Sequence, residues 1–115
     1  MQLNETDKMA LEFNKKIREK LGDRVGSFVI EKVNDDSDNR FFSITFKMYD
    51  YYVICFNYDR GFFSCCIDFD VHGCINLESS QKCWDTADFD IFFEELKNEI
   101  ELRIPDKFLR AKGWL

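Results

Sequence analysis

The first part of the chain has the hydrophobic period of an amphipathic helix. Its apolar residues are spaced three or four positions apart, at Ala10, Phe13, Ile17 and Leu21. Acidic residues lie near its start and basic residues near its end, which complements the helix dipole. Gly22 follows and can adopt the left-handed conformation that often ends a helix. The pattern predicts a helix from about Glu5 to Leu21.

The middle of the chain has the period of two that is typical of strands. Segment 27–33 (SFVIEKV) predicts a strand, and the acidic segment 34–39 (NDDSDN) predicts a solvated loop, or alternatively an acidic docking patch. Strands over 40–49, 52–58 and 62–71 follow, joined by a turn around Asp50 and another at Arg60 and Gly61. Segment 71–84 is harder to interpret and leaves room for a short fifth strand from Cys74 to Leu77. The pattern predicts an antiparallel meander of four or five strands.

The two turns also predict which residues of the strands lie opposite each other. The expected pairs are Phe46 with Ile54, Ile44 with Phe56, Tyr58 with Phe63, Phe56 with Cys65, Ile54 with Ile67 and Tyr52 with Phe69. All of these side chains would lie on one apolar face. The opposite face would hold Ser43, Thr45, Lys47, Val53, Cys55, Asn57, Ser64, Cys66, Asp68 and Asp70. A shift of one residue would exchange the two faces, and this register is preferred because it separates apolar from polar residues.

The C-terminal part again has a helical period. Segment 85–104 predicts a helix capped by Asp85 or Thr86, with Asp88 and Asp90 at its positive end. Pro105 either ends this helix or begins a short terminal one that Gly113 closes. The fold class expected is α+β in a single domain over residues 1–115, with two C-terminal helices packed on one sheet face. The core is expected to contain Phe42, Ile44, Phe46, Ile54, Phe56, Phe63, Ile67, Phe89, Phe92, Phe93, Leu96 and Ile100.

Composition narrows the classes of function. The chain has 115 residues, 45% of them hydrophobic, which suits one folded domain. Its formal net charge is -6, which disfavours nucleic-acid binding and suits a basic protein partner. The charged N-terminal segment does not resemble a signal peptide, and no apolar run is long enough to span a membrane. Five cysteines, an odd number, indicate free thiols, so a cytoplasmic protein is expected.

No arrangement of residues in the sequence indicates catalysis. Cys65 and Cys66 are adjacent and would point to opposite faces of a strand, and His72 is the only histidine. Zinc ligands usually occur in closely spaced pairs, which the sequence lacks. Asp68 and Asp70 would share one strand face, as paired carboxylates of hydrolases do, but nothing else suggests a substrate cleft. No catalytic residue, metal or cofactor is therefore expected, and a small hydrolase is the weakest alternative.

Tyrosines and acids near the predicted turns suggest a protein-binding surface instead. Tyrosine combines apolar area with a polar group and is enriched at interfaces, although it also simply favours strands. The residues expected to bind a partner are Tyr49, Tyr51, Cys55, Asn57, Asp59, Asp68 and Asp70.

The C-terminal segment resembles a known class of proteins. The run LRIPDKFL, Leu102 to Leu109, with AKGW after it, is similar to the C-terminal region of small bacterial immunity proteins, the partners of polymorphic toxins such as those of contact-dependent growth inhibition. The resemblance covers about the last fifth of the chain. It implies a non-catalytic protein that binds the C-terminal domain of a toxin, expected to be basic and nuclease-like, and occludes it. The chain would then be a monomer apart from the toxin. The alternative is an acidic secretion chaperone that holds an effector and dimerises.

Overall fold

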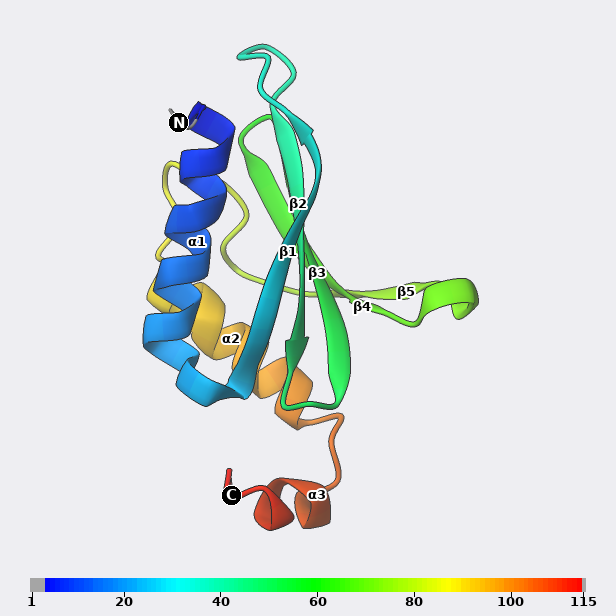
Figure 1. Cartoon of the computed structure of the whole chain (residues 1–115). Coiled ribbons are helices and arrows are strands. Elements are labelled where there is room, and N and C mark those ends of the chain that lie inside the picture. The colour runs from blue at the N-terminus through cyan, green and yellow to red at the C-terminus, as the bar shows by residue number, and fades with distance from the viewer. Residues whose placement is uncertain (1–3, 115) are drawn as a thin grey trace.

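The computed structural model describes residues 4–114, which form a helical layer on an antiparallel sheet (Figure 1). In chain order the elements are α1 (Glu5–Leu21), the 3-10 turn η1 (Gly22–Arg24), β1 (Val25–Asn34), β2 (Phe41–Met48), β3 (Tyr52–Asp59), β4 (Phe62–Asp68), the 3-10 turn η2 (Asp70–His72), β5 (Cys74–Leu77), α2 (Phe89–Glu101) and α3 (Asp106–Ala111). The fold is α+β, with the predicted order of elements and both C-terminal helices packed against the sheet. The bounds of α1 agree with those predicted.

The sheet is a meander in which every strand pairs with the next, in the order β1-β2-β3-β4-β5. The predicted register is confirmed at both central hairpins: Ile44 lies opposite Phe56, and Phe56 lies opposite Cys65. Arg60 and Gly61 form the two-residue turn between β3 and β4, both with positive φ, as a tight hairpin of this length requires. The short fifth strand, which the sequence left undecided, is present as β5.

One face of the sheet forms the core with α1 and α2, which lie on the same side of it in Figure 1. Phe13 of α1 is fully buried, and its ring stacks on that of Phe56 in β3 with 4.0 Å between the ring centroids. Phe93 of α2 meets the same Phe13 ring at 5.6 Å. The predicted core is confirmed: all its members are buried except Phe89, which is partly buried against the cluster.

The helix α2 begins later than predicted because the preceding segment is held by the sheet. The backbone N–H of Trp84 donates to the carbonyl of Gly61 in the β3–β4 turn, at 2.9 Å. Asp88 then caps the helix, accepting hydrogen bonds from the N–H groups of Asp90 at 3.0 Å and Ile91 at 3.3 Å. The prediction that Asp85 or Thr86 caps the helix is therefore wrong, since neither residue reaches its first turn.

The acidic loop between β1 and β2 is anchored to α1 by its first aspartate. Asp35 accepts hydrogen bonds from the backbone N–H of Thr6 at 3.0 Å and from its hydroxyl at 2.6 Å. Arg40 donates to the same hydroxyl at 3.0 Å. The hydrogen bonds from Thr6 lower the pKa of Asp35. This part of the loop thus stabilises the start of α1, while the carboxylates beyond it remain in solvent.

Candidate protein-binding face

The second face of the sheet is uncovered by any helix of the described chain, and we call it the open face. Because side chains alternate along a strand, every second residue points to this side. Its residues are Val29, Glu31, Phe41, Ser43, Thr45, Lys47, Val53, Cys55, Asn57, Asp59, Phe62, Ser64, Cys66, Asp68, Cys74 and Asn76. Four large apolar side chains of this set are in solvent: Val29, Phe41, Val53 and Phe62. The open face is therefore a mixed surface of apolar, acidic and small polar groups.

Two phenylalanines and one aspartate form a row at one end of the open face. Phe41, Asp59 and Phe62 are directly opposite one another on β2, β3 and β4. The side chain of Phe62 is 62% exposed and that of Phe41 is 38% exposed. Asp59 lies between the rings and forms a solvent-exposed ion pair with Arg60 at 2.9 Å. This end of the open face is thus an exposed row of two aromatic rings with a carboxylate between them.

The centre of the open face is a small hydrogen-bonded network. Asn57 accepts hydrogen bonds through its side-chain oxygen from the hydroxyl of Ser43 at 2.8 Å and from the thiol of Cys55 at 3.5 Å. These short side chains cover one another, so Ser43 is buried although no helix lies above it. The larger exposed side chains of the face, Phe41 and Phe62, lie outside this network.

The Cys66 thiol on this face is unsuited to nucleophilic chemistry. Cys66 is only 7% exposed, and burial, together with the nearby thiols of Cys55 and Cys74, raises its pKa to about 12. The thiolate is the reactive form, so Cys66 stays protonated at neutral pH.

The structure brings four of the seven predicted partner-binding residues together on the open face. They are Cys55, Asn57, Asp59 and Asp68, from strands β3 and β4. Asp70 is not on the same strand face as Asp68, contrary to the prediction, because β4 ends and Asp70 lies in η2 with a positive φ. Its backbone N–H donates to the carboxylate of Asp68 at 2.8 Å, which turns the chain away.

The two tyrosines of the β2–β3 turn lie outside the open face. Tyr49 is fully buried: its N–H donates to the carbonyl of Arg24, its hydroxyl donates to Glu101, and burial raises its pKa. It cannot contact a partner as predicted, since its left-handed φ directs it into the protein. Tyr51 is exposed, but it packs edge-on against Phe108 of α3.

The prediction missed the exposed phenylalanines, which are the largest groups on the open face. Phe41 precedes Phe42 and Phe62 precedes Phe63, so the alternation already assigned each of them to the polar side. The sequence contained this information, because extending the period-two alternation by one more position in each strand places Phe41 and Phe62 on the polar side. A pair of adjacent phenylalanines in a strand must place one ring on each face.

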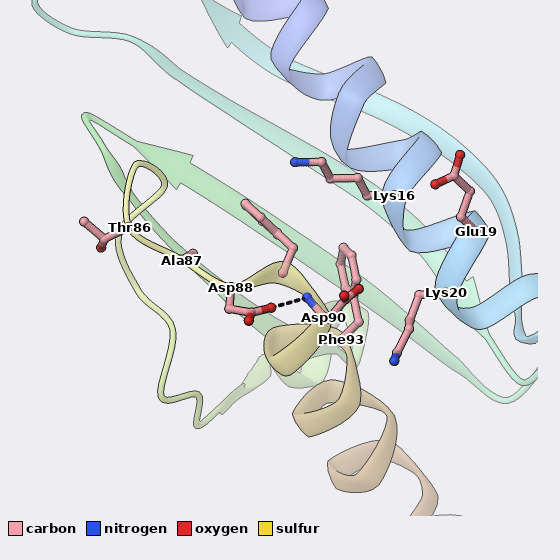
Figure 2. Close-up of a pocket in the computed structure, with 9 residues that line it drawn as sticks. Lys16, Glu19, Lys20, Thr86, Ala87, Asp88, Asp90 and Phe93 are labelled. Atoms are coloured by element: carbon pink, nitrogen blue, oxygen red, sulfur yellow. Dashed lines mark hydrogen bonds between the residues drawn. The ribbon is translucent and has the colours of Figure 1, made fainter.

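A hollow between α1 and the start of α2 is the other candidate for a site (Figure 2). It has a volume of about 600 Å³, and Figure 2 shows Lys16, Glu19 and Lys20 reaching it from α1. Asp88 and Asp90 lie at the opposite wall, where Asp88 is occupied in capping α2. Lysines from α1 face aspartates at the start of α2, so the charges that line this hollow are mixed.

In segment 4–114 no three His, Cys, Asp or Glu side chains come close enough together to hold a metal ion. No helix in that segment has both the length and the apolar character needed to cross a membrane. No family model, curated protein or solved structure matches this chain.

Proposed function

We propose that this chain is a non-catalytic protein-binding domain that neutralises a cognate toxin domain by covering it with the open face of its sheet. The observation that carries the binding role is the pair of exposed rings, Phe41 and Phe62, beside a hydrogen-bonded network of small polar side chains. Exposed rings cost solvation free energy in a free protein and contribute most of the affinity when a partner desolvates them.

Charge supports a basic partner. The chain has a formal net charge of -6. The open face itself carries Glu31, Asp59 and Asp68 against a single lysine, Lys47. Acidic groups on a binding face accelerate encounter with a basic protein and disfavour other acidic proteins. A nuclease domain, whose substrate-binding surface is basic, has the complementary charge.

The toxin part of the proposal rests on the likeness of the C-terminal run to immunity proteins. In the fold this run lies away from the open face. Ile104 and Leu109 are buried, and Pro105 immediately precedes α3, so these residues dock α3 against the sheet. The assignment to a toxin partner therefore rests on the sequence likeness of this run, whose residues have a structural role in docking α3. The binding role rests on the open face.

The test is a growth assay with the toxin domain encoded beside this chain. The toxin domain is expressed with and without this protein, and the association of a catalytically inactive toxin variant is measured by calorimetry. Rescue of growth with formation of a complex is expected. Absence of both rescue and association would show that the immunity function is wrong.

The location of the interface is tested by two matched substitutions of exposed apolar residues. Phe62→Asp places a charge in the aromatic row, and we expect it to weaken binding at least tenfold, the effect of losing a moderate hot spot. Leu102→Asp changes an even more exposed residue just after the end of α2, remote from the open face, and should leave binding unchanged. Equal affinities for the two variants would mean that the partner binds elsewhere.

The oligomeric state separates this function from its alternative. A toxin inhibitor acts as a monomer that forms a complex with one toxin domain, whereas a secretion chaperone would normally be an obligate dimer. Sedimentation of the purified chain alone distinguishes the two. A stable dimer that holds an effector segment would favour the chaperone.

A further inference from the structure

The strand β5 is a free edge of the sheet, and its outward backbone groups can be identified. The N–H of Phe69 donates to the carbonyl of Gly73, and in an antiparallel ladder the bonded pairs alternate from there. Ile75 and Leu77 therefore bond to β4, where they lie opposite Ile67 and Cys65. The N–H and C=O groups of Cys74 and Asn76 point away from the sheet. None of the hydrogen bonds of the described chain uses these four groups.

The two edges of the sheet differ in how they are protected. The pairing of β1 with β2 is interrupted twice by register shifts, one between Val25 and Phe28 and one between Glu31 and Asn34. Irregularities of this kind, and charged side chains, normally prevent an edge from pairing with another strand. The sequence of β5 is CINL, without a charge or a proline, and its pairing with β4 is regular. Ile75 is 46% exposed. Apart from its short length of four residues, β5 thus lacks the usual protection.

Acidic groups surround this unprotected edge. On the helix side, a groove of about 880 Å³ runs between the end of β5, the loop after it and α2, and its charged lining is Glu78, Lys82, Glu95 and Glu99. Ser80 donates to Glu95, and Glu99 pairs with Arg103 at 2.9 Å. On the open-face side, Asp68 lies opposite Cys74. Carboxylates therefore outnumber cations on both sides of the plane that an added strand would occupy.

We propose that the β5 edge binds an extended segment of another protein that carries Lys or Arg at alternate positions. The backbone of that segment would pair with Cys74 and Asn76, and its basic side chains on the helix side would reach the carboxylates of the groove. This rests on the proposed function in that the partner bound by the open face would supply the segment. A second copy of the chain is disfavoured as the occupant, because two acidic edges would face each other.

The experiment uses a blocked peptide that alternates Lys with Thr or Val, added to the full chain at millimolar concentration. Amide hydrogen exchange is followed by NMR. In the free protein, the amides of Ile75 and Leu77 should be protected and those of Cys74 and Asn76 should not. The peptide should slow exchange at Cys74 and Asn76 about tenfold or more, since each amide gains a hydrogen bond. A peptide with Glu in place of Lys should have no effect. Unchanged exchange at both amides with the Lys peptide would overturn the inference.

Two substitutions at one position provide the matched control. Asn76→Pro removes an N–H that points outward, so the ladder with β4 stays intact while the added strand loses a donor. Asn76→Ala changes the side chain and keeps the N–H. Peptide binding should be lost with Asn76→Pro and retained with Asn76→Ala, and equal binding by both variants would contradict strand addition.

The outcomes also distinguish this inference from the proposed function. Protection of the edge without rescue from a toxin would leave the edge site standing and refute the toxin partner. Rescue from the toxin without protection of the edge would leave the proposed function standing and overturn the edge site. If Cys74 and Asn76 become protected in the chain alone as its concentration rises, the occupant is a second copy and the inference is wrong.

Discussion

The two faces of the sheet are made by the same strands, but phenylalanine is buried on one face and exposed on the other. Phe42 is 1% exposed and its neighbour Phe41 is 38% exposed, while Phe63 is 4% exposed and its neighbour Phe62 is 62% exposed. Two helices cover one ring of each pair, and solvent surrounds the other. The buried rings are explained by stability alone.

The exposed rings require another explanation. They add apolar surface in water without contributing to the core, and they lie in one row rather than being scattered. Single exposed apolar residues are ordinary on protein surfaces, whereas two exposed rings in one row on an uncovered sheet face are the feature on which the proposed binding role rests. The comparison therefore separates residues that hold the fold together from residues that are free to bind. Substitutions on each side of the sheet test that separation.

The largest effect is expected from the covered face. Phe56→Ala removes a ring that is fully buried and touches rings from α1 and α2, including Phe13 and Phe92. The free energy of unfolding, measured by urea denaturation, should fall by about 3–5 kcal/mol. A cost below about 1 kcal/mol would show that the covered face is not the core.

A smaller effect is expected where α2 begins over the covered face. Asp88→Ala removes the carboxylate that accepts two backbone N–H groups of the first turn, and should cost about 1 kcal/mol in the same assay. Asp85→Ala is the matched control, because Asp85 lies before the capping position, and it should cost nothing measurable. A larger loss of stability for Asp85→Ala than for Asp88→Ala would indicate that the helix begins near Asp85, as the sequence predicted.

A pH-dependent effect is expected where the β1–β2 loop holds α1. The folded-state pKa of Asp35 lies below its ordinary value of 3.8 because Thr6 donates to the carboxylate. Its contribution is therefore present above about pH 3.8 and is lost as the pH falls through the lowered folded pKa. The difference in unfolding free energy between the wild type and Asp35→Asn should shrink on acidification.

The control for this pH effect is in the same loop. Asp38→Asn changes an exposed aspartate whose carboxylate accepts none of the hydrogen bonds formed by residues 4–114. The unfolding free energy of this variant should change with pH as that of the wild type does. A difference for Asp35→Asn that stays constant from neutral pH to below pH 3 would exclude a role for its ionised form.

The smallest effect is expected on the open face. Val53→Thr replaces one exposed methyl group by a hydroxyl at nearly constant shape, and should change the unfolding free energy by no more than about 0.5 kcal/mol. The adjacent residue, Ile54, is fully buried, so Ile54→Thr should be clearly more destabilising. Similar costs for both would mean that the open face is also covered, for instance by a second chain.

Much of the fold could be predicted because it depends on local periods and turn lengths. A period of 3.6 placed α1 at its observed bounds, and a period of two assigned side chains to faces. The two-residue turn at Arg60 and Gly61 then determined the register of the central hairpin, because a short turn leaves only one pairing. The same reasoning placed Cys55, Asn57 and Asp68 on a common face.

Other features arose only when segments distant in sequence came together. Tyr49 is buried because Arg24 and Glu101 meet it from 25 and 52 residues away, and Asp35 is held by Thr6 at a separation of 29 residues. Trp84 delays α2 through its bond to the β3–β4 turn. The sequence by itself determined the strands, the helices and the two faces, since these follow from patterns within each segment. The tertiary structure decided which polar groups are enclosed and which edge is left free, since a polar side chain or a strand edge acquires partners only from chain that is remote in sequence.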